Sequence, residues 1–270
     1  MITVLGHSGF IGSHIVDELK SKGMKVFLPG RDEDLRGKKL GKVIYCIGLT
    51  ADAKKKPFDT IDAHINKLSE IILHSDFEDI TYASSTRVYI HGNGSTSESS
   101  FIPVNVTDPF ELFNLTKLTA ESLLMNTVKN FKIIRYSNVY GPDLKSENFL
   151  TSIISEAIKT GSITLYTTRS SSKDYISISD AAKLSIDISL NGREKIYNVG
   201  SGINTTNGAI TDRIAELLNC EIFYSESSKE IIFPQIDIDL IKREFNYESP
   251  TNLIDSIELL ISVFRKELDK

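Results

Sequence analysis

The 270-residue chain has few cysteines, no long apolar run and no concentration of charge of one sign. Its two cysteines, Cys46 and Cys220, lie far apart without CxxC spacing, which argues against a disulfide framework and a zinc site. We therefore expect no metal site and expect both thiols to act as small apolar core groups. The apolar runs are far shorter than the roughly 20 residues that a membrane-spanning helix needs. No membrane association is expected.

Two further absences limit the location and the partners of the protein. The first residues do not show the basic region, apolar stretch and cleavage site of a secretion signal, so we expect a cytoplasmic location. The formal net charge of −5 is modest, and the lysines are scattered along the chain. A nucleic-acid-binding protein would carry a basic patch or stripe. We therefore expect no nucleic-acid partner.

The apolar pattern of the first half of the chain predicts alternating strands and helices. We expect strands at residues 2–5, 26–28, 43–47, 80–83 and 132–135, and helices at 11–22, 61–74 and 110–125. This alternation is typical of a parallel sheet that is covered by helices. Only residues 31–42 separate the second and third strands, so we expect an abbreviated sheet edge or a single extended turn there. The predicted fold class is α/β, a Rossmann-like doubly wound parallel sheet.

The pattern loosens after Gly141 into stretches rich in Ser, Thr and Asn, with helical patterns at residues 149–159, 210–218 and 253–264. A chain of this length can bury one large core with an appended region. We predict a dinucleotide-binding domain over residues 1–142, with strands returning from about 163–200. Residues 143–270 would mainly form a smaller C-terminal lobe that carries the specificity loops.

A glycine-rich loop follows the first predicted strand and opens the first predicted helix. Glycines in such a loop let the backbone turn tightly, approach a pyrophosphate and pack the helix on the strand. The helix N-terminus adds N–H groups and a positive dipole. In this context the loop predicts dinucleotide binding, and the contacts are expected from Gly6, Ser8, Gly9, Phe10, Ile11 and Gly12.

The end of the second predicted strand bears on the choice of cofactor. Gly30 stands where an NAD-preferring site usually has an acid for the ribose hydroxyls, and Arg31 could neutralise the 2′-phosphate of NADP. This pattern favours NADP. NAD stays the alternative, because an arginine in a charged loop is often only solvated and Asp32 could reach a ribose.

Ser84, Ser85 and Thr86 close the fourth predicted strand, at the edge where open parallel sheets bind their ligands. We expect the Ser85 hydroxyl to hydrogen-bond a carbonyl or alcohol of a substrate, with Thr86 beside it. The alternative is a serine run that merely caps the strand.

Phe113 and Lys117 are four residues apart on a predicted helix and so share one face. In a Tyr-x-x-x-Lys pair the ammonium lowers the phenol pKa from its usual value of about 10 and also holds the nicotinamide ribose. Lys117 can still do the second of these. Phe113 has no phenol, so the sequence lacks the usual proton donor at this position.

Together these motifs resemble the extended short-chain dehydrogenase/reductases, the NAD-dependent epimerase/dehydratase family of nucleotide-sugar enzymes. Three later segments are similar to segments of that family: Arg-Tyr-Ser-Asn-Val-Tyr-Gly-Pro at 135–142, Lys-Asp-Tyr-Ile-Ser-Ile-Ser-Asp at 173–180 and Tyr-Asn-Val-Gly-Ser-Gly at 197–202. The likeness covers nearly the whole chain. It implies a nucleotide-sugar substrate held mainly by residues 143–270.

The resemblance also implies a role for each matched position. Ser85 would contact the substrate hydroxyl, Phe113 would occupy the position of the catalytic tyrosine, and Lys117 would be the supporting base and ribose ligand. The substrate would also contact Asn138 and Lys173, which replaces an arginine that helps to bind the diphosphate. The cofactor path would be bordered by Leu49 and Tyr136.

From these features we expect an NADP-dependent reductase of a nucleotide-linked 4-keto-6-deoxysugar. The short chain, the small C-terminal lobe and the loop that contains Arg31 favour a reductase over an epimerase. A nucleotide-sugar 4-epimerase with tightly bound NAD is the alternative within the family. A non-catalytic nucleotide- or partner-binding protein is the alternative from another class, because fold alone does not fix function.

Phe113 has two explanations in sequence terms. It is either a Tyr-to-Phe change that inactivates the enzyme, or a natural phenylalanine. In the second case the protein binds without turnover, or takes its proton from Ser85, Thr86 or water. The resemblance further implies a homodimer, in which the apolar faces of the helices at residues 61–74 and 110–125 could form the contact. The alternative is that these apolar faces pack only on the sheet.

Overall fold

The computed structural model describes residues 1–49, 53–92, 94–108, 110–143, 148–249 and 251–268. Its largest unit is a six-stranded sheet in the order β2-β1-β3-β4-β5-β9, and every neighbouring pair is parallel. The strands are β1 (Ile2–Leu5), β2 (Val26–Phe27), β3 (Lys39–Tyr45), β4 (Asp76–Ser85), β5 (Phe131–Tyr136) and β9 (Ile196–Val199).

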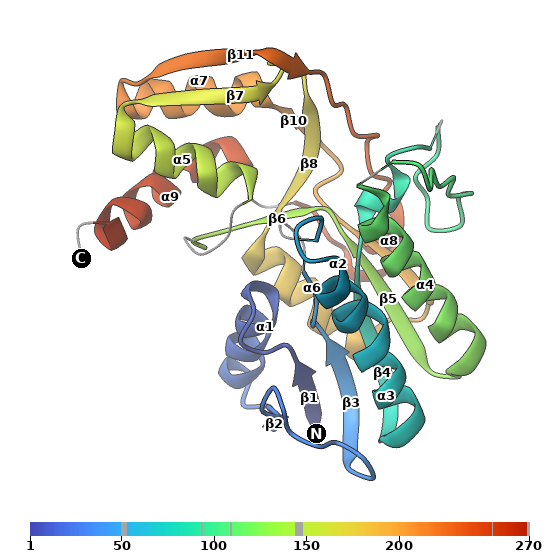
Figure 1. Cartoon of the computed structure of the whole chain (residues 1–270). Coiled ribbons are helices and arrows are strands. Elements are labelled where there is room, and N and C mark those ends of the chain that lie inside the picture. Colours follow the sequence, from blue (N-terminus) through green and yellow to red (C-terminus); the bar gives the residue numbers. More distant parts are fainter. Residues whose placement is uncertain (50–52, 93, 109, 144–147, 250, 269–270) are drawn as a thin grey trace.

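Helices cover both faces of this sheet. One face packs against α1 (Phe10–Ser21) and α6 (Ile178–Asn191). The other face packs against α3 (Lys67–His74) and α4 (Glu111–Thr127), and α2 (Pro57–Ile61) and the π-helical turn η1 (Asp62–Asn66) lead into α3. Both layers are visible on either side of the strands (Figure 1). The predicted Rossmann-like doubly wound fold is confirmed.

The order of the strands sets the position of the site. From β1 the chain crosses through α1 to β2 on one side, and β3 then pairs with β1 on the other side. The loops after β1 and β3 therefore diverge and open a crevice at the carboxyl ends of the strands, where sheets of this type bind ligands. The sheet edge at β2 is only two residues long, as the short connection at residues 31–42 predicts.

The rest of the chain builds a smaller region. Its strands are β6 (Asn138–Tyr140), β7 (Ser162–Thr167), β8 (Ser172–Ser177), β10 (Asn204–Thr206) and β11 (Glu221–Lys229), which form the sheets β10-β8-β6 and β11-β7. Its helices are α5 (Phe149–Thr160), α7 (Asn207–Leu218) and α9 (Leu253–Leu268), while α8 (Asp239–Phe245) packs near β9.

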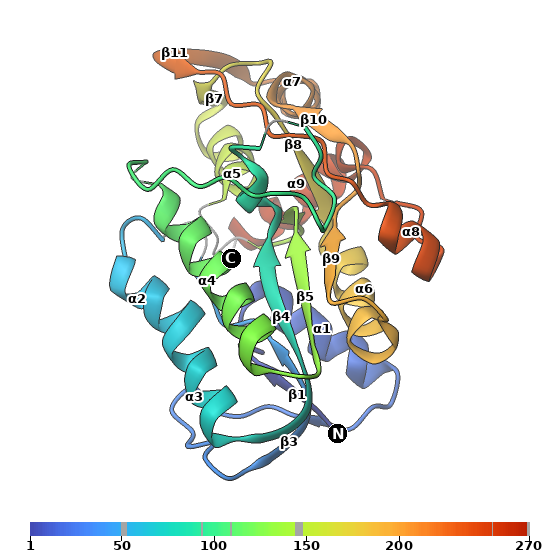
Figure 2. The same cartoon turned by 90° about the vertical axis from the view of Figure 1, so that its right-hand side faces the viewer.

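Two views show where this region lies. In both, α5, α7, β7 and β11 stand beyond the carboxyl ends of β3, β4 and β5 (Figures 1 and 2). Apolar side chains of α5, α7 and α9 form a separate core cluster there. The helices predicted at residues 149–159, 210–218 and 253–264 correspond to α5, α7 and α9, whereas α6 and α8 are additional. The division of the chain near residue 142 stays a prediction.

Within the described ranges, no helix is both long enough and apolar enough to cross a lipid bilayer.

Candidate active site

The glycine-rich loop between β1 and α1 leaves no room for side chains at two positions. Gly6 has φ +78°, and a Cβ on it would lie 2.7 Å from the backbone carbonyl carbon of Cys46. A Cβ on Gly12 would overlap the Gly6 carbonyl oxygen, which also accepts the Gly9 N–H at 3.0 Å. No side chain caps α1 and its first turn has no acidic residue. The N–H groups and the helix dipole are thus free to bind an anion, which suits a pyrophosphate.

The other predicted residues of this loop differ in exposure. Ser8 is exposed, whereas Ile11 is half-buried and packs towards the core. Phe10 is half-buried, and a Cβ on Gly141 would come within 3.0 Å of its ring. The same Cβ would lie 2.6 Å from Ile178, so Gly141 lets the chain pass closely over the start of α1 and α6.

The end of β2 carries a carboxylate that sequence reasoning missed. Arg31 is exposed. A turn brings Glu33 back to Gly30, whose N–H donates to the Glu33 carboxylate at 2.9 Å, and Lys38 donates to the other oxygen at 2.6 Å. These two hydrogen bonds lower the pKa of Glu33. An acid therefore stands at the end of β2 after all, supplied three residues further along the chain.

Lys117 extends from α4 to the carboxyl end of β4. Its ammonium donates to the Ala83 carbonyl at 2.8 Å and lies 4.9 Å from the centre of the Tyr82 ring. The ring of Phe113, one turn earlier on the buried face of α4, is 5.9 Å away. Burial lowers the pKa of Lys117 to about 7. Near neutral pH the group can therefore exist with or without its proton.

Ser85 is the last residue of β4 and caps a 3-10 turn, η2 (Thr86–Tyr89). Its oxygen accepts the Arg87 N–H at 3.2 Å, so this bond does not use the hydroxyl proton. The serine therefore caps the strand end and still has a proton to donate to a ligand. Ser85 is half-buried, and Thr86 is buried.

His64, in the π-helical turn η1, is a further site residue that sequence reasoning missed. The Leu49 N–H donates to Nε2 at 3.3 Å, so the ring proton is on Nδ1, which donates to the Thr116 hydroxyl at 2.8 Å. That hydroxyl donates to the Phe113 carbonyl at 3.0 Å. Burial lowers the pKa of His64 to about 3, so the ring is neutral. Turns of this kind often occur at functional sites.

This histidine connects two parts of the crevice. Its ring meets the Phe113 ring edge-on at 5.6 Å between centroids. A Cβ on Gly48 would lie 3.0 Å from His64 Nε2 and 3.4 Å from Lys117 Nζ, so both nitrogens lie against the chain that follows β3. A histidine inside an apolar helical pattern was the only sequence signal for this role.

The predicted substrate residues Asn138 and Lys173 lie on the smaller region's strands β6 and β8. The Asn138 amide donates to the Asp174 carbonyl at 2.9 Å. The Lys173 ammonium lies 5.1 Å from the centre of the Phe149 ring and 5.5 Å from that of Tyr175. Burial, followed by the charge of Arg87, lowers its pKa to about 8.

Asp174 explains why two of the sequence segments occur together. Its carboxylate accepts the backbone N–H groups of Ser201, Gly202 and Ile203 at 2.9, 2.6 and 3.1 Å. The segment at residues 173–180 is therefore bonded directly to the turn at 197–202. This contact fixes β8, and with it Lys173, relative to β9.

Tyr136, at the end of β5, is buried on the side of the sheet that faces α6. Its hydroxyl and that of Ser185 lie 2.6 Å apart. Burial raises the pKa of this phenol well above its usual range. The predicted contact of Tyr136 with a nicotinamide ring stays a prediction.

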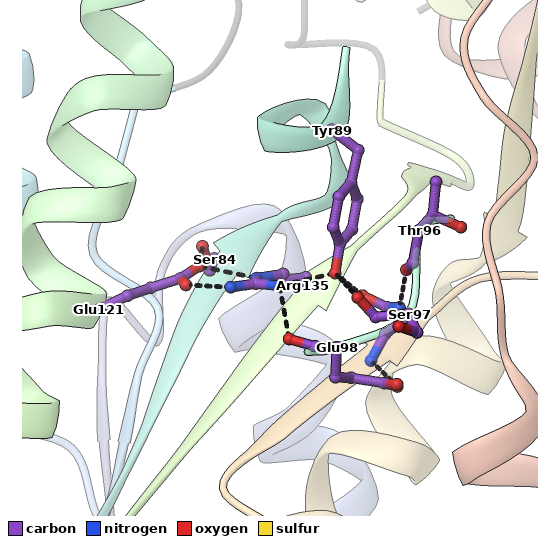
Figure 3. Close-up of polar contacts among 8 residues, drawn as sticks. Ser84, Tyr89, Thr96, Ser97, Glu98, Glu121 and Arg135 are labelled. Atoms are coloured by element: carbon purple, nitrogen blue, oxygen red, sulfur yellow. Dashed lines mark hydrogen bonds and ion pairs between the residues drawn. The ribbon is translucent and has the colours of Figure 1, made fainter. Parts of the chain in front are cut away.

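A buried polar network lies beneath the Ser85 end of β4 (Figure 3). The Arg135 guanidinium donates to both oxygens of Glu121, at 2.6 and 3.1 Å, and to the Tyr89 hydroxyl at 2.6 Å. Glu121 also accepts the Ser84 hydroxyl. The Tyr89 hydroxyl donates to Asn198 at 2.9 Å. The network joins β4, β5, α4 and β9. All of its side chains are buried, so it supports the site from below and is not accessible to a ligand.

The fold and this site are those of a Rossmann-like α/β protein with a glycine-rich loop at the carboxyl end of its first strand. The chain belongs to the NAD dependent epimerase/dehydratase family, whose profile matches residues 2–66 and 35–200. A putative UDP-glucose 4-epimerase of Methanocaldococcus jannaschii is 26% identical in an alignment of 286 positions, gaps included. The alignment covers 90% of this chain and 91% of that protein.

Solved structures show the same fold at lower identity. MoeE5 in complex with UDP-glucose and NAD superposes with a TM-score of 0.82 at 20% identity, over 99% of both chains. The UDP-glucose 4-epimerase of Thermotoga maritima, solved with UDP-glucose, gives 0.78 at 20% identity over 99% of both chains.

Proposed function

We propose that the protein is an NAD-dependent nucleotide-sugar 4-epimerase that acts on a UDP-linked hexose. The similarity to a putative UDP-glucose 4-epimerase along 90% of the chain carries this proposal. It favours the epimerase alternative over the NADP-dependent reductase that the sequence alone favours. An epimerase in this family uses the same side chains as a reductase, so the sequence motifs are equally compatible with it.

The glycine-rich loop and its flanking residues fit NAD. The loop would hold the pyrophosphate, and Lys117 would hold the nicotinamide ribose. Glu33, which is held at the end of β2 by the Gly30 N–H, would accept hydrogen bonds from the adenine ribose hydroxyls and would repel a 2′-phosphate. When bound, NAD supplies the chemistry of taking a hydride from C4 of the hexose and returning it.

The chain's own residues act on the oxygen of that carbon. The Ser85 hydroxyl would donate a hydrogen bond to the C4 oxygen while Arg87 N–H holds its own oxygen in place. Phe113 cannot exchange a proton with the substrate. Proton transfer in this chain is left to Ser85, Thr86 or water, so we expect turnover to be slow.

Substitution Phe113→Tyr tests the proposal. A phenol one turn from Lys117 should raise the rate of interconversion of UDP-glucose and UDP-galactose by about 10²- to 10⁴-fold, the usual contribution of a general acid or base. The reaction is followed by NMR of the sugar anomeric protons, without added NAD. Phe113→Leu is the control and should give no gain. Turnover that requires NADPH and a 4-keto sugar would instead establish the reductase.

A second candidate is a non-catalytic nucleotide-sugar-binding protein, and Phe113 itself favours it. The phenylalanine ring is packed against His64 with only 8% of its surface exposed, so the position is filled without a reactive group. Under this alternative NAD and UDP-glucose bind to the protein, but the Phe113→Tyr variant shows no turnover of any UDP-hexose.

A further inference from the structure

Arg87 is a cation next to Ser85, whose hydroxyl is proposed to bind the C4 oxygen of the sugar. It is the second residue of η2, directly after the strand end. Its backbone N–H donates to the Ser85 hydroxyl oxygen at 3.2 Å, so its main chain lies one hydrogen bond from that oxygen. The side chain is half-buried. An arginine side chain spans about the width of a hexose ring, so its guanidinium is within reach of a sugar held by Ser85.

Two acids affect the charge state of the Arg87 guanidinium, and among the described residues neither forms an ion pair with it. The charges of Asp108 and Glu111 raise the pKa of Arg87, against a larger lowering by burial. The carboxylates of these two acids lie 3.9 and 3.0 Å from His91 Nε2. The Glu111 carboxylate also accepts the Asn114 amide at 2.9 Å. The two acids thus favour the charged form of Arg87 without using its hydrogen-bond donors.

A second cation reinforces the positive potential at this place. The Arg87 charge contributes, after burial, to the lowered pKa of Lys173, so the two positive charges act on the same part of the site. Lys173 is half-buried and lies over two aromatic rings. Two positive charges that have lost part of their hydration repel each other, and a bound anion between them offsets this repulsion. The pair therefore favours an anionic ligand.

Sugar chemistry indicates which anion lies nearest to Arg87. In a nucleotide-linked hexose the diphosphate is attached at C1, on the opposite side of the ring from C4. Position C6 is attached to C5, the direct neighbour of C4. A cation next to the residue that binds the C4 oxygen is therefore closer to a substituent at C6 than to the diphosphate. A C6 carboxylate, as in a hexuronic acid, matches the planar pair of donors that a guanidinium offers.

We propose that Arg87 binds the C6 carboxylate of the sugar and that the substrate is a UDP-linked hexuronic acid. This inference rests on the proposed function and specifies its substrate class. Lys173, which the family resemblance assigns to the diphosphate, adds to the positive potential of the site.

Calorimetry on the protein with NAD tests the proposal by comparing UDP, UDP-glucose and UDP-glucuronic acid. The slow turnover expected with Phe113 lets binding be measured before reaction. The wild type should bind UDP-glucuronic acid at least about tenfold more tightly than UDP-glucose, the size of one charge-assisted hydrogen bond or more. Arg87→Gln should remove this preference while leaving UDP and UDP-glucose within about twofold. Arg87→Lys should keep part of it.

Arg243→Gln, which changes an exposed arginine on α8, is the matched control and should bind all three ligands like the wild type. Equal or tighter binding of UDP-glucose by the wild type would overturn the inference alone, and this comparison does not depend on whether a variant folds. A loss of all three ligands in Arg87→Gln would place Arg87 at the diphosphate and also overturn it. If the wild type binds none of the three, the proposed function fails as well.

Discussion

At the scale of single residues, the burial of Lys117 gives the site a group that titrates near neutral pH. Its pKa falls from an ordinary 10.5 to about 7 because the ammonium loses water in the crevice. In the unfolded chain the same group keeps its proton up to about pH 10.4. Between these two values the unfolded state binds more protons, so the free energy of unfolding rises with pH.

Substitution Lys117→Met should therefore flatten the pH dependence of stability. We expect the wild type to gain up to about 1.4 kcal/mol per pH unit from this group above pH 7, and the variant to lack that gain. Urea unfolding at several pH values between about 7 and 9.5 measures the difference. Lys173, whose pKa is about 8, contributes to both proteins and cancels in the comparison. Lys159→Met, on the exposed side of α5, should keep the wild-type slope.

Glu33 leads to a prediction about the cofactor. Because its carboxylate is held at the end of β2 by Gly30, the wild type should bind NAD several-fold more tightly than NADP. Glu33→Ala should weaken NAD binding and narrow this difference, and fluorescence titration with both reduced cofactors measures it. Asp34→Ala, which changes an exposed acid in the same loop, should leave the preference unchanged. If the wild type bound NADPH more tightly than NADH, the result would favour the NADP-dependent reductase over the epimerase.

Single residues also show which parts of the candidate site the sequence can predict. The glycine-rich loop, Ser85 and Lys117 are recognisable because their proposed roles depend on local spacing within one strand–turn–helix or one helical turn. Glu33 and His64 are not, since their roles arise from contacts that the chain makes only after folding. Glu33 reaches Gly30 through a turn, and His64 reaches Thr116 across 52 residues.

At the scale of elements, the buried pair Arg135–Glu121 fastens α4 to β5. Both side chains are at most 4% exposed, and Glu121 follows Lys117 by one turn. We expect Arg135→Met to destabilise the protein by about 3–5 kcal/mol, because it leaves a buried carboxylate without its partner. The double variant Glu121→Gln/Arg135→Met should lose less than the two single variants together. Urea unfolding measures all three.

The surface pair of Glu18 in α1 and the C-cap residue Lys22 provides the comparison, because water reaches both side chains. Lys22→Met should change stability by less than about 1 kcal/mol. If Arg135→Met also had so small an effect, the network would contribute little to the attachment of α4. Hydrogen exchange gives a second readout, since the network also holds Ser97 and Glu98 through Tyr89 and Arg135.

The elements that the sequence predicts are those with one dominant periodicity. Residues 184–190 of α6 alternate strictly between apolar side chains and Ser or Asp, a pattern typical of a strand. They are helical because α6 packs against the sheet and against its neighbour α1, so even Ser185 and Ser189 have no exposed surface. In β11 the side chains are mostly exposed and include three serines, so no alternating apolar pattern marks the strand. In both α6 and β11, tertiary packing determines the secondary structure.

At the scale of the whole molecule, the outer faces of the α2–α3 segment and of α4 carry exposed apolar side chains. Phe58 is 84% exposed, Leu73 72% and Met125 44%. The two segments run side by side in both views (Figures 1 and 2). This arrangement supports the homodimer that the family resemblance implies, and the dimer stays a prediction.

Sedimentation should give twice the chain mass of 30.1 kDa for the wild type. Leu73→Glu should shift the protein towards the single-chain mass, because a charge would be buried at the contact. Leu259→Glu, at a 66% exposed position on α9, should leave the mass unchanged. A wild type that sediments at 30.1 kDa at all concentrations would exclude the dimer.

The parallel pairing of β5 with β9 has a consequence for biosynthesis. The six residues of β5 are all buried in the finished protein, yet the strand that covers one side of them is β9, encoded some sixty residues later. While the ribosome is still making the intervening chain, β5 is an open, apolar edge that can pair with another nascent chain. Expression of residues 1–142 alone would make that transient exposure permanent, and the fragment would need a chaperone to stay unaggregated.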